Sequence, residues 1–182
     1  STLDSIVVTA QRREQEIQDV PVSISAFSAQ DIEARGATSL SDLAAFTPNF
    51  NFADYDSGMN LHLRGVGSSD ASLFFDPGVG VFLDGVYLPR LRGLDLDLVG
   101  IERIEVLRGP QGTLFGKNTI GGAVSVVSKR PGDEFAGSAE ITTGRFNRLD
   151  GRLSIEGPIV PGKLAGQLAG VVRSRDGYGR RL

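Results

Sequence analysis

Glycine occurs throughout this chain and limits how it can fold. The 182 residues include 24 glycines, about twice the average usage, and most of them stand between short apolar runs. Glycine at such places is typical of tight turns and of strands that approach one another closely. No run comes near the roughly 18 consecutive apolar residues of a membrane helix. The sequence therefore predicts a fold of short strands and turns.

Charge and composition exclude several classes of function. The net charge is −3, and the 19 Lys and Arg residues are scattered, without the basic stripe of a nucleic-acid-binding surface. The chain has no cysteine, which rules out disulfides and thiolate metal sites. Its single histidine, His62, stands in an alternating run typical of a strand. We therefore expect no metal site, no cofactor and no nucleic-acid partner.

Residues 20–131 carry the signals of an α+β unit. Residues 22–27 alternate apolar and small polar side chains, as a strand does. Ser28 and Asp31 have the spacing of a capping box, and a second short helix is expected between Ser39 and Pro48. Further strands are expected over 61–65, 79–83, 86–88, 103–107 and 121–128, with a turn at Asp84-Gly85 and loops over 49–60 and 68–77.

Beyond Pro131 the helical signals stop and alternation takes over. Residues 138–143 and 149–156 place apolar or small side chains on one face and polar or charged ones on the other. Residues 163–173 continue the pattern more loosely. This alternation fits transmembrane β-strands, with lipid on one side and an aqueous lumen on the other, and it fits a half-buried soluble sheet equally well.

No motif for catalysis is present. Residues 108–119 invite a phosphate-loop interpretation, because a glycine–lysine pair follows a strand there. The first glycine of that motif is replaced by Gln111, and its hydroxyl residue by Asn118. Glu102 and Glu105 are expected on the polar face of a strand, and their spacing does not single out a carboxylate pair. We predict that the chain is not an enzyme.

Four segments are distinctive in sequence and in order. They are residues 4–10 (DSIVVTA), 63–67 (LRGVG), 81–87 (VFLDGVY) and 101–131 (IERIEVLRGPQGTLFGKNTIGGAVSVVSKRP). In this order they resemble the TonB box, the Arg-Gly strand end, the Asp-Gly hairpin and the plug signature of TonB-dependent outer-membrane receptors. The long signature is the most specific of the four.

The resemblance implies a three-part organisation. Residues 1–19 are expected to form a mobile N-terminal arm with the TonB box. Residues 20–131 are expected to form an α+β plug domain, with a mixed four-stranded β-sheet and short helices. Residues 132–182 are expected to supply the first two or three antiparallel strands of a truncated transmembrane β-barrel. A 22-stranded barrel needs more than about 200 residues, so we expect a fragment that cannot form the pore.

The resemblance also implies two sites that do not bind cargo. In the family the TonB box pairs with the C-terminal domain of TonB, which here points to Asp4, Ser5, Ile6, Val7, Val8, Thr9 and Ala10. Arg64 and Arg108 match the two family arginines that meet glutamates on the barrel wall. Because those glutamates are missing from this chain, we expect both arginines to be exposed or paired locally.

The implied function is energy-coupled uptake of a small-molecule cargo, an iron chelate such as a ferric siderophore. The location would be the outer membrane of a Gram-negative bacterium, with the plug in the barrel lumen and the TonB box on the periplasmic side. Cobalamin, a carbohydrate or an aromatic compound is the alternative cargo, and a stand-alone soluble binding module is the alternative role. The expected substrate-facing residues are Phe50, Phe52, Asp54, Tyr55, Ser69, Asp70, Phe74, Phe75, Arg90 and Arg92.

Overall fold

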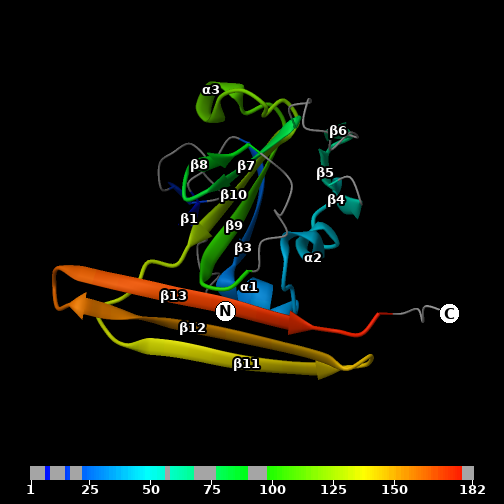
Figure 1. Cartoon of the computed structure of the whole chain (residues 1–182). Helices are drawn as coiled ribbons and strands as arrows, with labels where there is room; N and C mark the ends of the chain where they lie inside the picture. The colour runs from blue at the N-terminus through cyan, green and yellow to red at the C-terminus, as the bar shows by residue number, and fades with distance from the viewer. Residues whose placement is uncertain are drawn as a thin grey trace, which may run out of the picture. The chain divides into compact units, whose positions relative to one another are not determined.

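The computed structural model forms two compact units, residues 1–128 and 129–182, each described by itself (Figure 1). It describes residues 7–8, 15–16, 22–55, 58–67, 77–89 and 98–177. In these ranges the side chains of residues 7, 15–16, 53–55 and 58–59 are not described.

A mixed five-stranded sheet forms the centre of the first unit. Its strand order is β3-β9-β10-β7-β8, and β10 pairs in parallel with β7 while the other neighbours are antiparallel. The sequence predicted a mixed sheet of four strands, so the described residues hold one strand more than expected. The strands are β3 (Ser23–Ser28), β7 (Val79–Leu83), β8 (Val86–Leu88), β9 (Ile101–Arg108) and β10 (Gly122–Ser128).

Two short helices begin where their caps predict. For α1 (Ala29–Ala34), the Ser28 N–H donates to the Asp31 carboxylate at 3.0 Å, and the Asp31 N–H donates to Ser28 Oγ at 3.2 Å. For α2 (Leu40–Ala44), the Asp42 carboxylate accepts from Thr38 N–H at 2.7 Å and from Ser39 N–H at 3.1 Å. In the ranges described, no helix is long and apolar enough to cross a membrane.

Both capping carboxylates are stabilised in their charged form. The side-chain hydrogen bond from Ser28 is the main reason why the pKa of Asp31 is lowered. Burial by itself would raise the pKa of Asp42, but the hydrogen bonds from Thr38 and Ser39 together outweigh burial and leave that pKa lowered. Both helix starts therefore depend on ionised aspartates.

We expect Asp42→Ala to lower the free energy of unfolding by about 1 kcal/mol at neutral pH, because the start of α2 loses its hydrogen-bond acceptor. The folded pKa of Asp42 lies below the ordinary value of 3.8. The contribution of ionised Asp42 to the free energy of unfolding is therefore complete above pH 3.8 and is lost as the pH falls through the lowered pKa. Denaturant unfolding should be measured at neutral and acidic pH. The difference in free energy of unfolding between the native chain and Asp42→Ala should become smaller in acid.

Asp133→Ala is the matched control, since Asp133 is exposed and its replacement should leave stability unchanged within about 0.5 kcal/mol. A gap between Asp42→Ala and the native chain that is the same at both pH values would contradict the proposed role of the ionised carboxylate.

The two faces of the five-stranded sheet are covered differently. The helices α1 and α2 and the hairpin of β4 (Phe50–Tyr55) and β5 (Gly58–Leu63) cover the larger apolar cluster, which includes Ile32, Leu40, Leu43, Leu63 and Val124. A smaller cluster on the opposite face consists of Val8, Phe82, Leu107 and Ala123. In Figure 1, α2, β4 and β5 lie on one side of the sheet and β1 (Val7–Val8) lies on the other. Burial on both faces explains why the central strand β10 carries only small and apolar side chains.

A second, three-stranded antiparallel sheet lies in a region predicted to be partly loop. It consists of β4 (Phe50–Tyr55), β5 (Gly58–Leu63) and β6 (Val66–Gly67). The loop expected over 49–60 is therefore wrong, because Phe50 pairs with Leu63 and Phe52 with Leu61. The buried Phe50 side chain packs into the core, and this burial stabilises a strand that its polar neighbours Asn49 and Asn51 obscured.

The Asp-Gly turn between β7 and β8 is confirmed. Asp84 and Gly85 have φ values of 49° and 81°, which are the two positive values of a type I′ hairpin turn. The Asp84 carboxylate also accepts a hydrogen bond from the Ser128 N–H at 2.8 Å and another from the Ser128 hydroxyl. The turn is thereby bound to the end of β10, 44 residues away.

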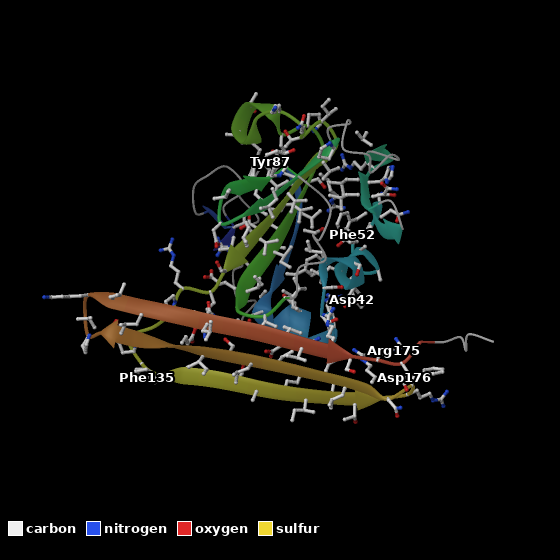
Figure 2. All side chains as sticks on the ribbon, viewed as in Figure 1. Asp42, Phe52, Tyr87, Phe135, Arg175 and Asp176 are labelled. Carbon is white, nitrogen blue, oxygen red and sulfur yellow. The ribbon has the colours of Figure 1, made fainter. Side chains whose placement is uncertain are left out.

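The second unit is a three-stranded antiparallel sheet in the order β11-β12-β13. Opposite residues in its register share a face, so Ile155 and Leu168 stand side by side, as do Ile141, Gly151 and Val172. That face is apolar and exposed. The other face carries the ion pairs Arg148–Asp150 and Arg152–Glu140. The strands are β11 (Ala136–Gly144), β12 (Arg148–Val160) and β13 (Leu164–Ser174), and Phe135 labelled in Figure 2 directly precedes β11.

Candidate functional site

A closed loop joins β9 to β10 and forms the middle of the distinctive segment 101–131. We call residues 109–121 the signature loop. Its neck is closed by two backbone hydrogen bonds, Gly109 N–H to Gly121 O at 3.0 Å and Gln111 N–H to Thr119 O at 2.9 Å. A single helical turn, α3 (Gly112–Phe115), lies inside it and was not predicted. The signature loop is therefore an ordered element that is held by its own backbone hydrogen bonds.

Aromatic contacts hold the signature loop against the sheet. The Phe115 ring meets the Phe82 ring edge-on at 5.0 Å, and the Tyr87 ring lies 5.4 Å from Phe82. Asn118 Nδ2 donates to the Tyr87 hydroxyl at 3.1 Å, and Tyr87 is labelled near α3 in Figure 2. The sequence gives no signal for this set, because Tyr87 and Asn118 are 31 residues apart and neither belongs to a motif that pairs them.

The structure brings the two predicted arginines to the neck of this loop. The nearest guanidinium nitrogen of Arg64 lies 3.8 Å from the point where a Cβ on Gly109 would stand, and Gly109 follows Arg108 directly. Arg64 itself has a positive φ of 54°, and its N–H donates to Asn49 O at 2.8 Å. The Arg64 guanidinium therefore lies beside the neck of the signature loop, and Arg108 is the residue at which the chain enters that neck.

Both arginines were expected to be exposed or paired locally, and this holds for Arg64 but not for Arg108. Arg64 is exposed. Arg108 is half-buried, and its Nε atom is buried without a hydrogen-bond partner. Within the described ranges neither side chain forms an ion pair. A buried guanidinium nitrogen without a partner costs free energy, so this neck is suited to receive acceptor oxygens.

The carboxylate expected on an exposed strand face is in fact fully buried. Glu105 has 0% exposure, and its carboxylate accepts from Arg103 Nε at 2.9 Å. The expectation failed because β9 lies between β3 and β10 in a sheet whose two faces are both covered by apolar clusters. In the ranges described, no group of three or more His, Asp or Glu residues could hold a metal ion.

The arm contributes a short strand pair to the first unit. Of the residues matched to the TonB box, only Val7 and Val8 are described, and they form β1. They pair antiparallel with β2 (Gln15–Glu16) in the register Val7–Glu16 and Val8–Gln15. The Val8 side chain is fully buried among Phe82, Leu107 and Ala123. Asp4, Ser5, Ile6, Thr9 and Ala10 lie outside the described residues.

Of the ten predicted substrate-facing residues, the structure describes the side chains of Phe50 and Phe52. Phe50 is a correction: it is only 6% exposed and belongs to the core, so it does not face a substrate. Phe52 is half-buried against the same core, with its ring 6.4 Å from that of Phe50. The side chains of Asp54 and Tyr55, and all of Ser69, Asp70, Phe74, Phe75, Arg90 and Arg92, lie outside the described residues.

Known receptors resemble this chain in sequence. The pesticin receptor of Yersinia pestis is 30% identical over 177 residues, which cover 95% of this chain and 26% of the receptor. The iron-regulated outer membrane virulence protein of Vibrio cholerae is 28% identical over 180 residues, with 92% and 26% coverage. The chain thus spans about a quarter of the length of the curated relatives it matches.

Solved structures resemble it in fold. The ferric yersiniabactin uptake receptor FyuA of Yersinia pestis matches with a TM-score of 0.74 and 30% identity, over 82% of this chain and 24% of that one. The pyoverdine outer membrane receptor FpvA of Pseudomonas aeruginosa matches with a TM-score of 0.79 over 94% of this chain and 25% of that one, and at 20% identity it supports the fold alone.

A family model for the whole plug decides the assignment. It is described as the TonB-dependent Receptor Plug Domain and matches residues 16–123, more than half of the chain. That range contains four strands of the five-stranded sheet and the start of β10, both capped helices, and the signature loop with Arg64 and Arg108. The chain belongs to the TonB-dependent receptor plug domain family.

Proposed function

We propose that this chain is the gate of an energy-coupled outer-membrane transporter that takes up a ferric siderophore. The observation that carries the proposal is the plug sheet with its complete signature loop, preceded in sequence by an arm whose Val7 and Val8 already have strand conformation. Relatives are named as receptors of iron chelates, including one for ferrioxamine B in Salmonella typhimurium. They are receptors, and nothing in the site argues for catalysis.

The arm is proposed as the docking strand for the C-terminal domain of TonB. Residues 4–10 are rich in β-branched side chains, and an extended strand can join the edge of a partner's sheet through main-chain hydrogen bonds. Val7 and Val8 already make such bonds within the chain to Gln15 and Glu16. When TonB binds, the backbone groups of Val7 and Val8 would leave this pairing and form hydrogen bonds with a strand of the partner instead.

The arginine pair is proposed to hold the plug against the wall of a barrel. Arg64 and Arg108 lie beside one loop neck without acidic partners in the described residues, and Arg108 Nε is buried and unbonded. Guanidinium groups bind carboxylates through paired, directional hydrogen bonds. Carboxylates from the barrel wall would accept hydrogen bonds from both guanidinium groups. When those bonds break, the plug could move away from the wall as a unit.

The second unit is proposed as the start of a transmembrane β-barrel in the outer membrane, with the plug in its lumen and the arm on the periplasmic side. Large apolar side chains on one face remain exposed, for example Ile141 at 76% and Leu168 at 73%. A sheet that folded against a soluble domain would bury that face, whereas lipid-facing strands leave it to hydrocarbon. The exposed face therefore favours a barrel over a stand-alone soluble module.

Cobalamin is the second candidate cargo. The vitamin B12 transporter BtuB of Photobacterium profundum is 29% identical over 187 residues, which cover all of this chain. Phe52, Asp54, Tyr55, Ser69, Asp70, Phe74, Phe75, Arg90 and Arg92 remain proposed cargo contacts.

Val8→Pro is expected to abolish binding of this chain to a TonB C-terminal domain. Proline removes the N–H that a strand pairing needs and breaks the pairing at its centre. Binding should be measured by calorimetry with the isolated partner domain. Val8→Ile is the control, because a β-branched residue keeps the strand and its N–H, and it should bind like the native chain. Unchanged affinity of the proline variant would remove the assignment of the docking strand.

A further inference from the structure

Val8 of the arm and Phe115 of the signature loop pack in one apolar cluster of the sheet. Val8 is fully buried in the cluster with Phe82, Leu107 and Ala123, on the face opposite the helices. Phe115 of the signature loop packs against the same cluster, with its ring edge-on to Phe82 at 5.0 Å. Phe82, only 3% exposed, therefore contacts the signature loop directly and belongs to the same buried cluster as Val8 of the N-terminal arm.

Two further contacts seat the signature loop on this face. The Asn118 side chain donates to the hydroxyl of Tyr87, whose ring lies 5.4 Å from that of Phe82. Thr119 is almost fully buried, and its methyl group lies only 2.7 Å from where a Cβ on Gly80 would stand. A side chain at position 80 would therefore push the loop away, and the glycine leaves it room to seat.

We propose that seating of the signature loop and docking of the arm are energetically coupled through Phe82. While Phe115 and Tyr87 hold the Phe82 ring, the ring forms a wall of the site that Val8 occupies. When the loop moves, the ring loses those contacts, and Val8 loses a wall of its site. Packed side chains shift between discrete arrangements rather than deforming continuously, so the effect reaches the arm.

The coupling gives the arginine pair a means of controlling the arm. Arg108 directly precedes the signature loop, and Arg64 lies against its neck at Gly109. Any event that displaces the neck would weaken the docking of Val8, and withdrawal of the arm would loosen the loop in return, because coupling is reciprocal. This regulatory meaning rests on the proposed function, in which β1 is the strand that the partner binds.

The test measures docking of the arm without a partner or cargo. The chain has no cysteine, so Val8→Cys in the full 182-residue chain, purified in mild detergent, provides the only thiol. Its labelling rate with a small maleimide reports how often the side chain at position 8 leaves its site. Adding Phe115→Ala is expected to raise that rate about threefold to tenfold, the equivalent of one lost aromatic pair. Tyr87→Phe, which removes only the Asn118 hydrogen bond, should raise it less.

Phe46→Ala is the matched control, because Phe46 is a half-exposed aromatic residue that packs on Arg35 away from this cluster. Its labelling rate should equal that of the Val8→Cys parent. Equal rates for the Phe115 and Phe46 variants, whether both are raised or both are unchanged, would overturn the coupling. Should Phe115→Ala fail to fold, Phe115→Leu keeps a side chain in place, and amide exchange at Val8 gives a second readout that must also accelerate.

The two proposals fail separately. A chain that shows the labelling response but does not bind a TonB C-terminal domain would sink the proposed docking role and leave the coupling intact. A chain that binds the partner through position 8 but shows no response to Phe115→Ala would sink the coupling alone.

Discussion

Gly122→Ala is expected to destabilise the first unit by about 3 kcal/mol or more. Gly122 has a φ of 148°, where a side chain is strained. A Cβ there would stand 2.2 Å from the Leu107 carbonyl oxygen and 2.4 Å from Leu63 Cδ2. The carbonyl belongs to the neighbouring strand β9, so it cannot move without breaking the sheet.

A shift in the midpoint of chemical denaturation would measure this loss. Gly112→Ala is the matched control, since no atom lies within 4 Å of its Cβ position and it begins α3. That variant should be as stable as the native chain or slightly more so, because alanine favours a helix over glycine by about 1 kcal/mol. Equal midpoints for the two variants would contradict the close approach at Gly122.

Leu63→Ala is expected to lower the free energy of unfolding by about 2–5 kcal/mol. Leu63 is fully buried, and it joins the sheet β4–β5–β6 to the main core. It also packs over Gly122 at the base of the signature loop. Removing its isobutyl group leaves a cavity where the two sheets meet, directly before Arg64.

The control for this second variant lies one residue away. His62 occupies the same strand, is half-buried and points to the opposite face. His62→Ala should cost less than about 1 kcal/mol in the same denaturation experiment. A loss for Leu63→Ala no greater than that for His62→Ala would mean that Leu63 does not connect the two sheets.

Local signals predicted the elements whose causes are local. The capping aspartates Asp31 and Asp42 mark the starts of both helices, because a cap is made by residues three or four positions apart. The turn at Asp84-Gly85 was equally readable, since positive φ angles restrict which residues fit. These features need only neighbours in sequence.

Two of the errors concern burial that the local sequence pattern does not show. The strand β4 looked like a loop, because its polar residues gave no sign that Phe50 would pair with Leu63 and enter the core. Glu105 looked exposed, because its strand alternates apolar and charged side chains and only the sheet order places it inside. In each case burial was decided by strands contributed from elsewhere in the chain.

The candidate site divides in the same way. Arg64 and Arg108 were found by their place in two distinctive segments, and the structure adds that both lie at one loop neck. Val8 was expected in an arm, and the structure adds that it is buried. The contacts of Phe82 with Phe115 and of Asn118 with Tyr87 had no signal in the sequence at all.

By itself, the sequence determined the family, the caps, the tight turns and the alternation of the last 50 or so residues, because each depends on residue types at short, regular spacing. Only the tertiary structure decided that β1, β7 and the signature loop contribute to one apolar cluster and that Arg64 lies beside the neck that follows Arg108. The physical reason is that packing is set by which faces of distant strands must be buried together, and no local pattern specifies that choice.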